Sequence, residues 1–275
     1  MSDADRPHDL GELWVCHLGL VPYLDALAVQ RRVHTRRLAG EIPDTLLLLE
    51  HPAVYTRGRR SGAEDLPFGE GFYRARGIDV IATDRGGKLT YHGPGQLVGY
   101  PIMAVADVGA HLRTIEDAIV HALSAEGVIA RTRHGEGADY TGVWVQERKI
   151  ASIGVHVSHA ISSHGFAVNV HNDLEPFSWV TACGLPDVRM TSIAAELHGP
   201  VPRHADCDSA PSGSADAARM PCVSCFRRRV AHSFCQAHSR RQRLVSPWRL
   251  GIDTTNAPPL NENGIPAPVG EPVPA

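Results

Sequence analysis

Short apolar runs and amphipathic segments follow one another through the first two hundred residues. Runs of apolar residues bounded by turn residues predict strands at 12–20, 45–50, 78–83, 97–103, 128–133, 142–146, 149–157 and 164–170. Apolar residues that recur every three or four positions predict helices at 22–39, 112–123 and 191–197. These elements mix without a regular strand–helix–strand alternation. The pattern therefore favours an α+β fold with a mixed, mostly antiparallel sheet and flanking helices.

The pattern changes from about residue 200. Val223, Phe226, Val230 and Phe234 recur at helical spacing and predict one amphipathic helix. Residues 251–275 contain six prolines and no lysine or arginine, which is typical of a disordered tail. We expect four parts, namely a flexible N-terminus (1–11), a main domain (12–200), a C-terminal extension (201–250) and a disordered Pro-rich tail (251–275).

Composition excludes several classes of function. The net charge of −3 does not suit a nucleic-acid binder, and no apolar run approaches the roughly 20 residues that span a bilayer. The first residues are polar and acidic, unlike a secretory signal, so we expect a cytoplasmic protein. Lys88 and Lys149 are the only lysines among 27 basic residues, which hints that their chemistry is needed.

Residues 85–101, RGGKLTYHGPGQLVGYP, are rich in glycine and lie between two predicted strands. A glycine-rich loop brings backbone N–H groups close to a ligand because no Cβ intervenes. The alternative is a wide Gly/Pro turn without a ligand. A dinucleotide-binding loop does not fit, because Gly93-x-Gly95 is followed by Gly99 in the wrong register and Pro94 interrupts it.

Cys183 lies in a Cys-Gly turn and is a candidate nucleophile, although a single cysteine is more often a small apolar core residue. A free thiol has a pKa near about 8.5, so it needs a nearby cation or base to become a strong nucleophile. Lys149, at the start of the strand KIASIG, is a candidate for that cation. The alternative for Lys149 is a solvent-exposed charge at a strand edge.

The string at 85–101, KIASIG at 149–154, HGFAVNV at 164–170 and the Cys-Gly turn together resemble the motifs of the octanoyl-[acyl-carrier-protein]–protein octanoyltransferases, or lipoate–protein ligase B. In that family the cysteine carries octanoyl as a thioester and the lysine of KIASIG lowers the cysteine pKa. The resemblance therefore implies that Cys183 is the acyl nucleophile and that Lys149 activates it and serves as a base. The acyl pocket implied by the resemblance is lined by Arg85, Gly86, Gly87, Lys88, Leu89, Thr90, Tyr91, His92, Ser152, Ile153, Gly154, Gly165, Phe166 and Ala167.

These pocket residues suit the implied chemistry. We expect glycines 86, 87, 154 and 165 to let backbone N–H groups approach a thioester carbonyl. Ile153, Phe166 and Ala167 suit an eight-carbon chain, which gains about 0.8 kcal/mol for each buried CH₂. His92 is a candidate proton shuttle, but we favour a role in orienting the loop. The docking arginines expected for an acidic carrier protein are Arg57, Arg59, Arg60 and Arg74.

The resemblance covers about residues 12–200 and makes this the octanoyltransferase catalytic domain, with the core fold shared by biotin and lipoate protein ligases. It implies octanoyl-acyl carrier protein as donor. The implied acceptors are lipoyl domains of 2-oxoacid dehydrogenase E2 subunits and the glycine cleavage H protein. No cofactor or metal is expected. The chain departs from the family at Ala182, where a proline commonly precedes the cysteine, and after Pro200, where little matches.

Two other functions are considered. ATP-dependent lipoate–protein ligases share the fold, but they typically follow the loop histidine with Asp-x-Gly-Asn, where this chain has Gly93-Pro94-Gly95. A zinc module is suggested by a finger-like set, Cys222, Cys225, Cys235 and His238. On one continuous helix, however, Cys225 and Cys235 would lie about 15 Å apart along the axis, too far to share a metal. A further histidine set has no spacing typical of zinc: His156, His159, His164 and His171.

Overall fold

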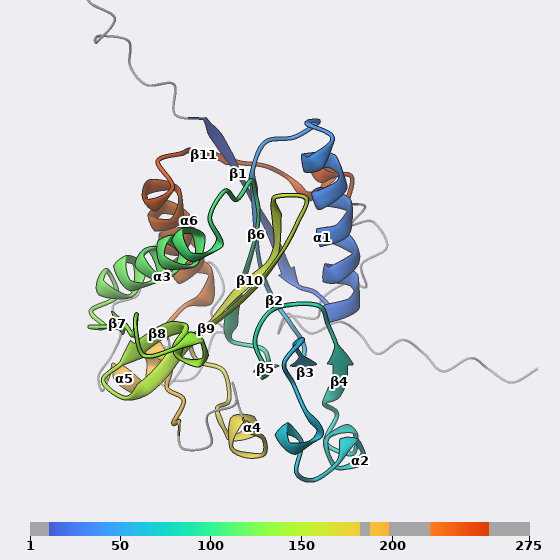
Figure 1. The fold of residues 1–275 in the computed structure, drawn as a ribbon. Helices are drawn as coiled ribbons and strands as arrows, with labels where there is room; N and C mark the ends of the chain where they lie inside the picture. Colours follow the sequence, from blue (N-terminus) through green and yellow to red (C-terminus); the bar gives the residue numbers. More distant parts are fainter. Residues whose placement is uncertain (1–10, 182–187, 198–220, 253–275) are drawn as a thin grey trace, which may run out of the picture.

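The chain is built around one large sheet, shown in Figure 1. The computed structural model describes residues 11–181, 188–197 and 221–252. Within these ranges the strand order is β11-β1-β2-β6-β10-β9-β8-β7. The strands are β1 (Glu12–Leu20), β2 (Thr45–Glu50), β6 (Gln96–Ile102), β7 (Arg131–Thr132), β8 (Gly142–Val145), β9 (Arg148–Ser158), β10 (Ile161–Asn169) and β11 (Arg241–Leu244). Strand β1 is parallel to β2 and β11, and the other neighbours are antiparallel. The predicted mixed, mostly antiparallel α+β fold is confirmed.

Helices cover both faces of this sheet because successive strand residues point to opposite sides. Leu13 and Val15 of β1 belong to the core under α3 (Val108–Ser124) and α6 (Val223–Ala237). Trp14, the residue between them, belongs to the core under α1 (Tyr23–Leu38). Figure 1 shows α1 on one side of the sheet and α3 with α6 on the other.

Local sequence signals mark where the helices begin and end. Pro22 is the N-cap of α1, and Gly40 adopts a φ of +73° just after that helix. The Asp107 carboxylate accepts a hydrogen bond from the Ala110 N–H and caps α3. Ser192 caps α5 (Ile193–Glu196) in the same way. In the described ranges, no helix combines the length and the apolar character needed to cross a membrane.

The predicted amphipathic helix after residue 200 is confirmed as α6. Phe226, Val230 and Phe234 are fully buried against the main core. Strand β11, which was not predicted, extends the main sheet beside β1. Part of the expected C-terminal extension therefore shares one core with the described residues before 198. The expected N-terminal segment up to residue 10 and the tail from residue 253 lie outside the described residues.

A second, smaller sheet of order β4-β3-β5 extends from one end of the main sheet. Its strands are β3 (Val54–Arg57), β4 (Asp79–Ala82) and β5 (Leu89–His92), accompanied by α2 (Glu70–Arg74) and α4 (Glu175–Ser178). The prediction of a buried strand at 78–83 is wrong in its burial, because β4 is an edge strand with Asp79 and Ala82 exposed. Residues 85–101 are likewise not one loop, since they contain β5 and most of β6. The predicted strand at 128–133 shortens to β7.

Candidate active site

A pocket opens between the loop before β5 and the hairpin of β9 and β10. Its space measures about 590 Å³, including the solvent at its mouth. The expected residues that line it are Arg85, Gly87, Lys88, Thr90, His92, Lys149, Ser152, Ile153, Gly154, Gly165, Phe166 and Ala167. Segments far apart in the sequence are thus brought together around one cavity.

Three expected pocket residues do not line it. Leu89 and Tyr91 alternate along β5 with Lys88, Thr90 and His92, so their side chains point to the opposite face of the strand. There they are buried in the aromatic core of the small sheet. Gly86 lies in the loop, but its N–H donates to the Val155 carbonyl at 3.0 Å instead of facing the cavity.

Two of the pocket glycines, Gly154 and Gly165, are required by close packing of backbones. A Cβ on Gly154 would lie 2.7 Å from the Gly86 carbonyl oxygen. A Cβ on Gly165 would lie 2.2 Å from the Gly99 carbonyl oxygen. Contacts below 3.0 Å are not found for real Cβ atoms, so a side chain at either position would force the strands or the loop apart.

Lys149 has a buried side chain, 2% exposed, that lines this pocket. Its Nζ lies 5.2 Å from the Trp144 ring centroid, within the range of a cation–π contact. Gly142 makes room for it, since a Cβ there would lie 2.7 Å from Lys149 Cε. The Glu116 carboxylate makes its contacts with residues other than Lys149: it accepts the Gly142 N–H at 2.7 Å and lies 3.2 Å from His134 Nδ1. Among the described residues, Lys149 forms no ion pair with a carboxylate, and its side chain lines the pocket.

The backbone of Lys149 joins the segment that follows the Cys-Gly turn. The Lys149 N–H donates to the Arg189 carbonyl and the Thr191 N–H donates to the Lys149 carbonyl, both at 2.9 Å. Met190 thus pairs with Lys149 as a parallel bridge. Cys183 itself lies outside the described residues.

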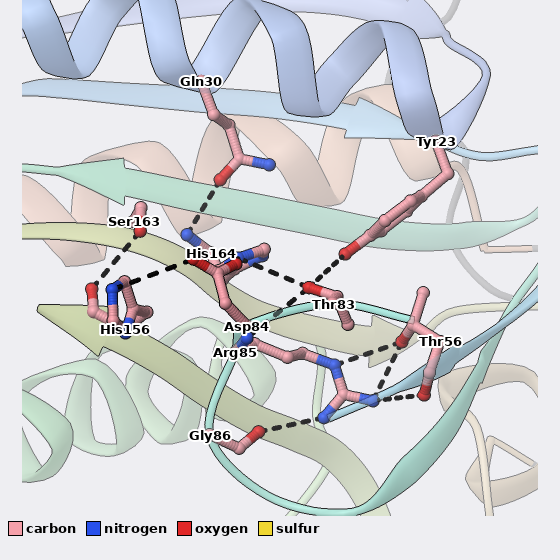
Figure 2. Close-up of polar contacts among 10 residues, drawn as sticks. All are labelled: Tyr23, Gln30, Thr56, Thr83, Asp84, Arg85, Gly86, His156, Ser163 and His164. Atoms are coloured by element: carbon pink, nitrogen blue, oxygen red, sulfur yellow. Dashed lines mark hydrogen bonds and ion pairs between the residues drawn. The ribbon is translucent and has the colours of Figure 1, made fainter. Parts of the chain in front are cut away.

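Buried hydrogen bonds fix Arg85 and His92 at the pocket. The Arg85 guanidinium donates to the hydroxyl and the carbonyl of Thr56 and to the Gly86 carbonyl, as Figure 2 shows. His92 Nδ1 lies 2.8 Å from Gln96 Oε1. Because the Gln96 amide nitrogen already donates to two other oxygens, Oε1 accepts and Nδ1 carries the proton. Burial holds the pKa of His92 well below its usual value, so the ring is neutral at pH 7.

Sequence reasoning missed part of the lining, namely Tyr23, Tyr100, Ala138, Asp139, Thr141 and His164. Tyr23 opens α1, and no local motif marks it as a pocket residue. Tyr100 lies within the motif at 85–101, and His164 is the first residue of the motif HGFAVNV. Both could therefore have been predicted as pocket residues from the sequence. The two tyrosines lie close to buried histidines, with ring centroids 6.1 Å apart for Tyr23–His92 and 6.4 Å for Tyr100–His164.

The two cysteines of the alternative zinc set that were compared above lie on one helix, and most of the expected docking arginines are paired with carboxylates. Cys225 and Cys235 are both buried along the continuous helix α6. In the part of the chain that the structure describes, no group of three His, Cys, Asp or Glu residues is placed to hold a metal. Arg57 and Arg74 both face Glu70, and Arg60 contacts Asp139 at 2.9 Å at the pocket edge.

Comparison with known proteins places the chain in a family. Residues 22–209 match the model described as the lipoyl protein ligase A/B catalytic domain. The chain is 48% identical over 188 residues to an octanoyltransferase from Rubrobacter xylanophilus, covering 67% of this chain and 83% of that one. It is also 48% identical over 195 residues to an octanoyltransferase from Mycobacterium ulcerans, covering 66% and 78%. This chain belongs to that octanoyltransferase family. It is an acyltransferase, and its reaction class is lipoyl or octanoyl transfer.

Solved structures share the fold. A lipoate-protein ligase A bound with ATP superposes with a TM-score of 0.62 at 16% identity, over 86% of this chain and 89% of that one. A bipartite lipoate protein ligase from Thermoplasma acidophilum, described with its E2 lipoyl domain, gives 0.59 at 19% identity, over 87% and 88%. The expected lipoate ligase core is therefore confirmed at the level of the fold.

Proposed function

We propose that this transferase works through a covalent octanoyl thioester on Cys183, activated by Lys149. The observation that carries the proposal is the buried Lys149 side chain, which lines the same pocket as Ile153, Phe166 and Ala167. A cation beside a thiol favours the thiolate electrostatically. The segment 189–191, which begins five residues after Gly184 of the Cys-Gly turn, hydrogen bonds to Lys149, which supports the pairing.

In the first half-reaction, the Cys183 thiolate attacks the carbonyl carbon of octanoyl-acyl carrier protein. A new carbon–sulfur bond forms on Cys183, and the bond to the phosphopantetheine sulfur breaks. The departing thiolate takes a proton, for which the Lys149 ammonium is the proposed donor. The alkyl chain lies against the apolar pocket residues, so binding draws on burial of its CH₂ groups.

In the second half-reaction, a lysine ε-amine of a lipoyl domain attacks the enzyme thioester. An amide bond forms, the Cys183 carbon–sulfur bond breaks, and the amine gives up a proton to neutral Lys149. This returns Lys149 to the ammonium form and Cys183 to the thiolate, so each turnover closes. A lipoyl-domain acceptor is supported by the family and by the related ligase that is described together with its E2 lipoyl domain.

The competing function on this fold is ATP-dependent ligation of free lipoate. The sequence relatives above are octanoyltransferases, whereas the ATP-bound relative shares the fold at only 16% identity. Intact-mass measurement after incubation with octanoyl-acyl carrier protein tests the proposal. We expect the mass of one octanoyl group on the wild type without ATP and none on Cys183→Ser. An unmodified wild-type protein that transfers only in the presence of ATP would contradict it.

A further inference from the structure

Asp84 lies between two histidines of neighbouring strands, as Figure 2 shows. His164 Nε2 of β10 lies 2.8 Å from one Asp84 oxygen, and His156 Nε2 of β9 lies 3.8 Å from the other. Burial lowers the pKa of His164, so this ring is neutral at pH 7 and donates from Nε2. Although burial acts to raise the pKa of Asp84, its hydrogen bond with His164 holds that pKa below the ordinary value. The contact is thus a neutral imidazole donating to a carboxylate.

His164 also has a backbone conformation that is unfavourable for a residue with a Cβ. Its φ is +54°, in the left-handed region that costs a non-glycine residue about 1–2 kcal/mol. The side chain of Gln30, from α1, accepts the His164 N–H at 2.8 Å. In the described structure, His164 Nδ1 and Gln30 Nε2 are buried without a hydrogen-bond partner. Strained backbone conformations and buried polar groups without a partner are found most often at functional sites.

The Asp84 contact spans the two walls of the pocket. Asp84 immediately precedes Arg85, and the loop that they share contributes Arg85, Gly87 and Lys88 to the lining. The opposite wall is the β9–β10 hairpin, to which His164 belongs. Where the walls meet, the Gly86 N–H donates to the Val155 carbonyl at 3.0 Å. Loop and hairpin are therefore in direct backbone contact, and any shift of the loop changes the width of the pocket.

The neighbouring loop residues make side-chain contacts with other elements as well as with the hairpin. Arg85 donates to Thr56 of the small sheet. The Thr83 hydroxyl accepts from Tyr23 of α1 at 3.3 Å and lies 3.5 Å from His164 Nε2. Asp84 makes the shorter of these two contacts with His164, and its contact is the charged one.

We propose that His164 and Asp84 form a positioning pair that holds residues 83–88 against the β9–β10 hairpin and thereby sets the pocket for the acyl donor. The role in donor binding rests on the function proposed above. Neither residue needs to touch the reacting carbonyl. A displacement of about 1 Å in a substrate-positioning element can cost on the order of a hundredfold in rate, so a pair of this kind is consequential.

Amide hydrogen exchange at Gly86, together with steady-state kinetics of octanoyl transfer, tests the pair. Asp84→Ala removes the acceptor, whereas Asp84→Asn keeps an oxygen that His164 can still donate to. We expect Asp84→Ala to speed Gly86 exchange and raise KM for octanoyl-acyl carrier protein about tenfold, with kcat within about twofold. Asp84→Asn should lie between it and the wild type. Asp79→Ala, which alters an exposed aspartate of β4, is the matched control and should change neither quantity.

The outcomes separate the pair from the chemistry. Unchanged Gly86 exchange in Asp84→Ala would overturn the positioning role, whatever the kinetics show. Faster exchange with an unchanged KM would overturn the role in donor binding. If the wild type forms no octanoyl-enzyme, the proposed function fails. The exchange measurement still tests the link between loop and hairpin in that case, because it does not depend on turnover.

Discussion

Gly142 is the residue whose replacement should disturb the Lys149 environment most directly. It adopts a φ of +140°, and an added Cβ would lie 2.4 Å from the Ala151 carbonyl oxygen and 2.7 Å from Lys149 Cε. We predict that Gly142→Ala is destabilising. A strained φ costs about 1–3 kcal/mol, and overpacking against a rigid strand costs about 1–3 kcal/mol more. The free energy of unfolding should therefore fall by about 2–6 kcal/mol.

The matched control for this substitution is Gly71→Ala. Gly71 lies in helix α2, where a Cβ meets no atom within 4 Å and alanine is the better helix former. Urea denaturation of both variants measures the difference, and the melting temperature of Gly142→Ala should fall by about 4 °C or more. Transfer activity of the folded Gly142→Ala protein should also fall, because the Cβ displaces the Lys149 side chain. Equal stability of the two variants would refute the packing argument around Lys149.

Three further outcomes are expected. Phe234 of α6 is buried in the main core, so Phe234→Ala should lower the free energy of unfolding by about 3–5 kcal/mol. Trp248 is 83% exposed, so Trp248→Ala should change the free energy of unfolding by no more than about 0.5 kcal/mol. Equal denaturation midpoints for the two variants would contradict the shared core. Burial lowers the pKa of His111 to about 4, below its unfolded value of about 6.5, so the unfolded state binds the extra proton. The free energy of unfolding should therefore fall as pH falls from about 6.5 to 4. In urea titrations at several pH values, His111→Leu should show a weaker dependence of the free energy of unfolding on pH. An unchanged dependence would argue against the burial of His111. Reversing Arg59 and Arg60 to Glu should raise KM for the acidic carrier protein and weaken its salt dependence, and identical kinetics across ionic strengths would place the docking face elsewhere.

Much of the main sheet and its helices followed from local sequence signals. Strand 45–50 coincides with β2, and the helix at 22–39 ends at Gly40, whose positive φ only glycine adopts freely. Strands β8 and β9 also lie at the two apolar runs predicted at 142–146 and 149–157. These elements have a clear apolar periodicity and a residue that ends them, so their secondary structure follows from local sequence and depends little on tertiary contacts.

The small sheet was harder to predict because its strands are short and its burial depends on distant partners. Strand β5 lies inside a glycine-rich string, and its pairing with β3 is not encoded locally. Because β5 was not predicted as a strand, the sequence did not show that alternate side chains point to opposite faces. Leu89 and Tyr91 were therefore wrongly expected in the pocket. Tyr23 lines the pocket only because of where α1 crosses the sheet, and that position is set by the tertiary fold.

The coupling between Cys183 and Lys149 is central to the proposed mechanism, and the pH profile of Cys183 alkylation measures it. With an ammonium beside the thiol, we expect wild-type alkylation to rise at a pH about 1–3 units lower than in Lys149→Ala. Lys149→Arg keeps the charge and should restore most of that shift, although arginine is a poor base for the final transfer step. Three superimposable profiles would contradict the account, even if Cys183 carried the octanoyl group.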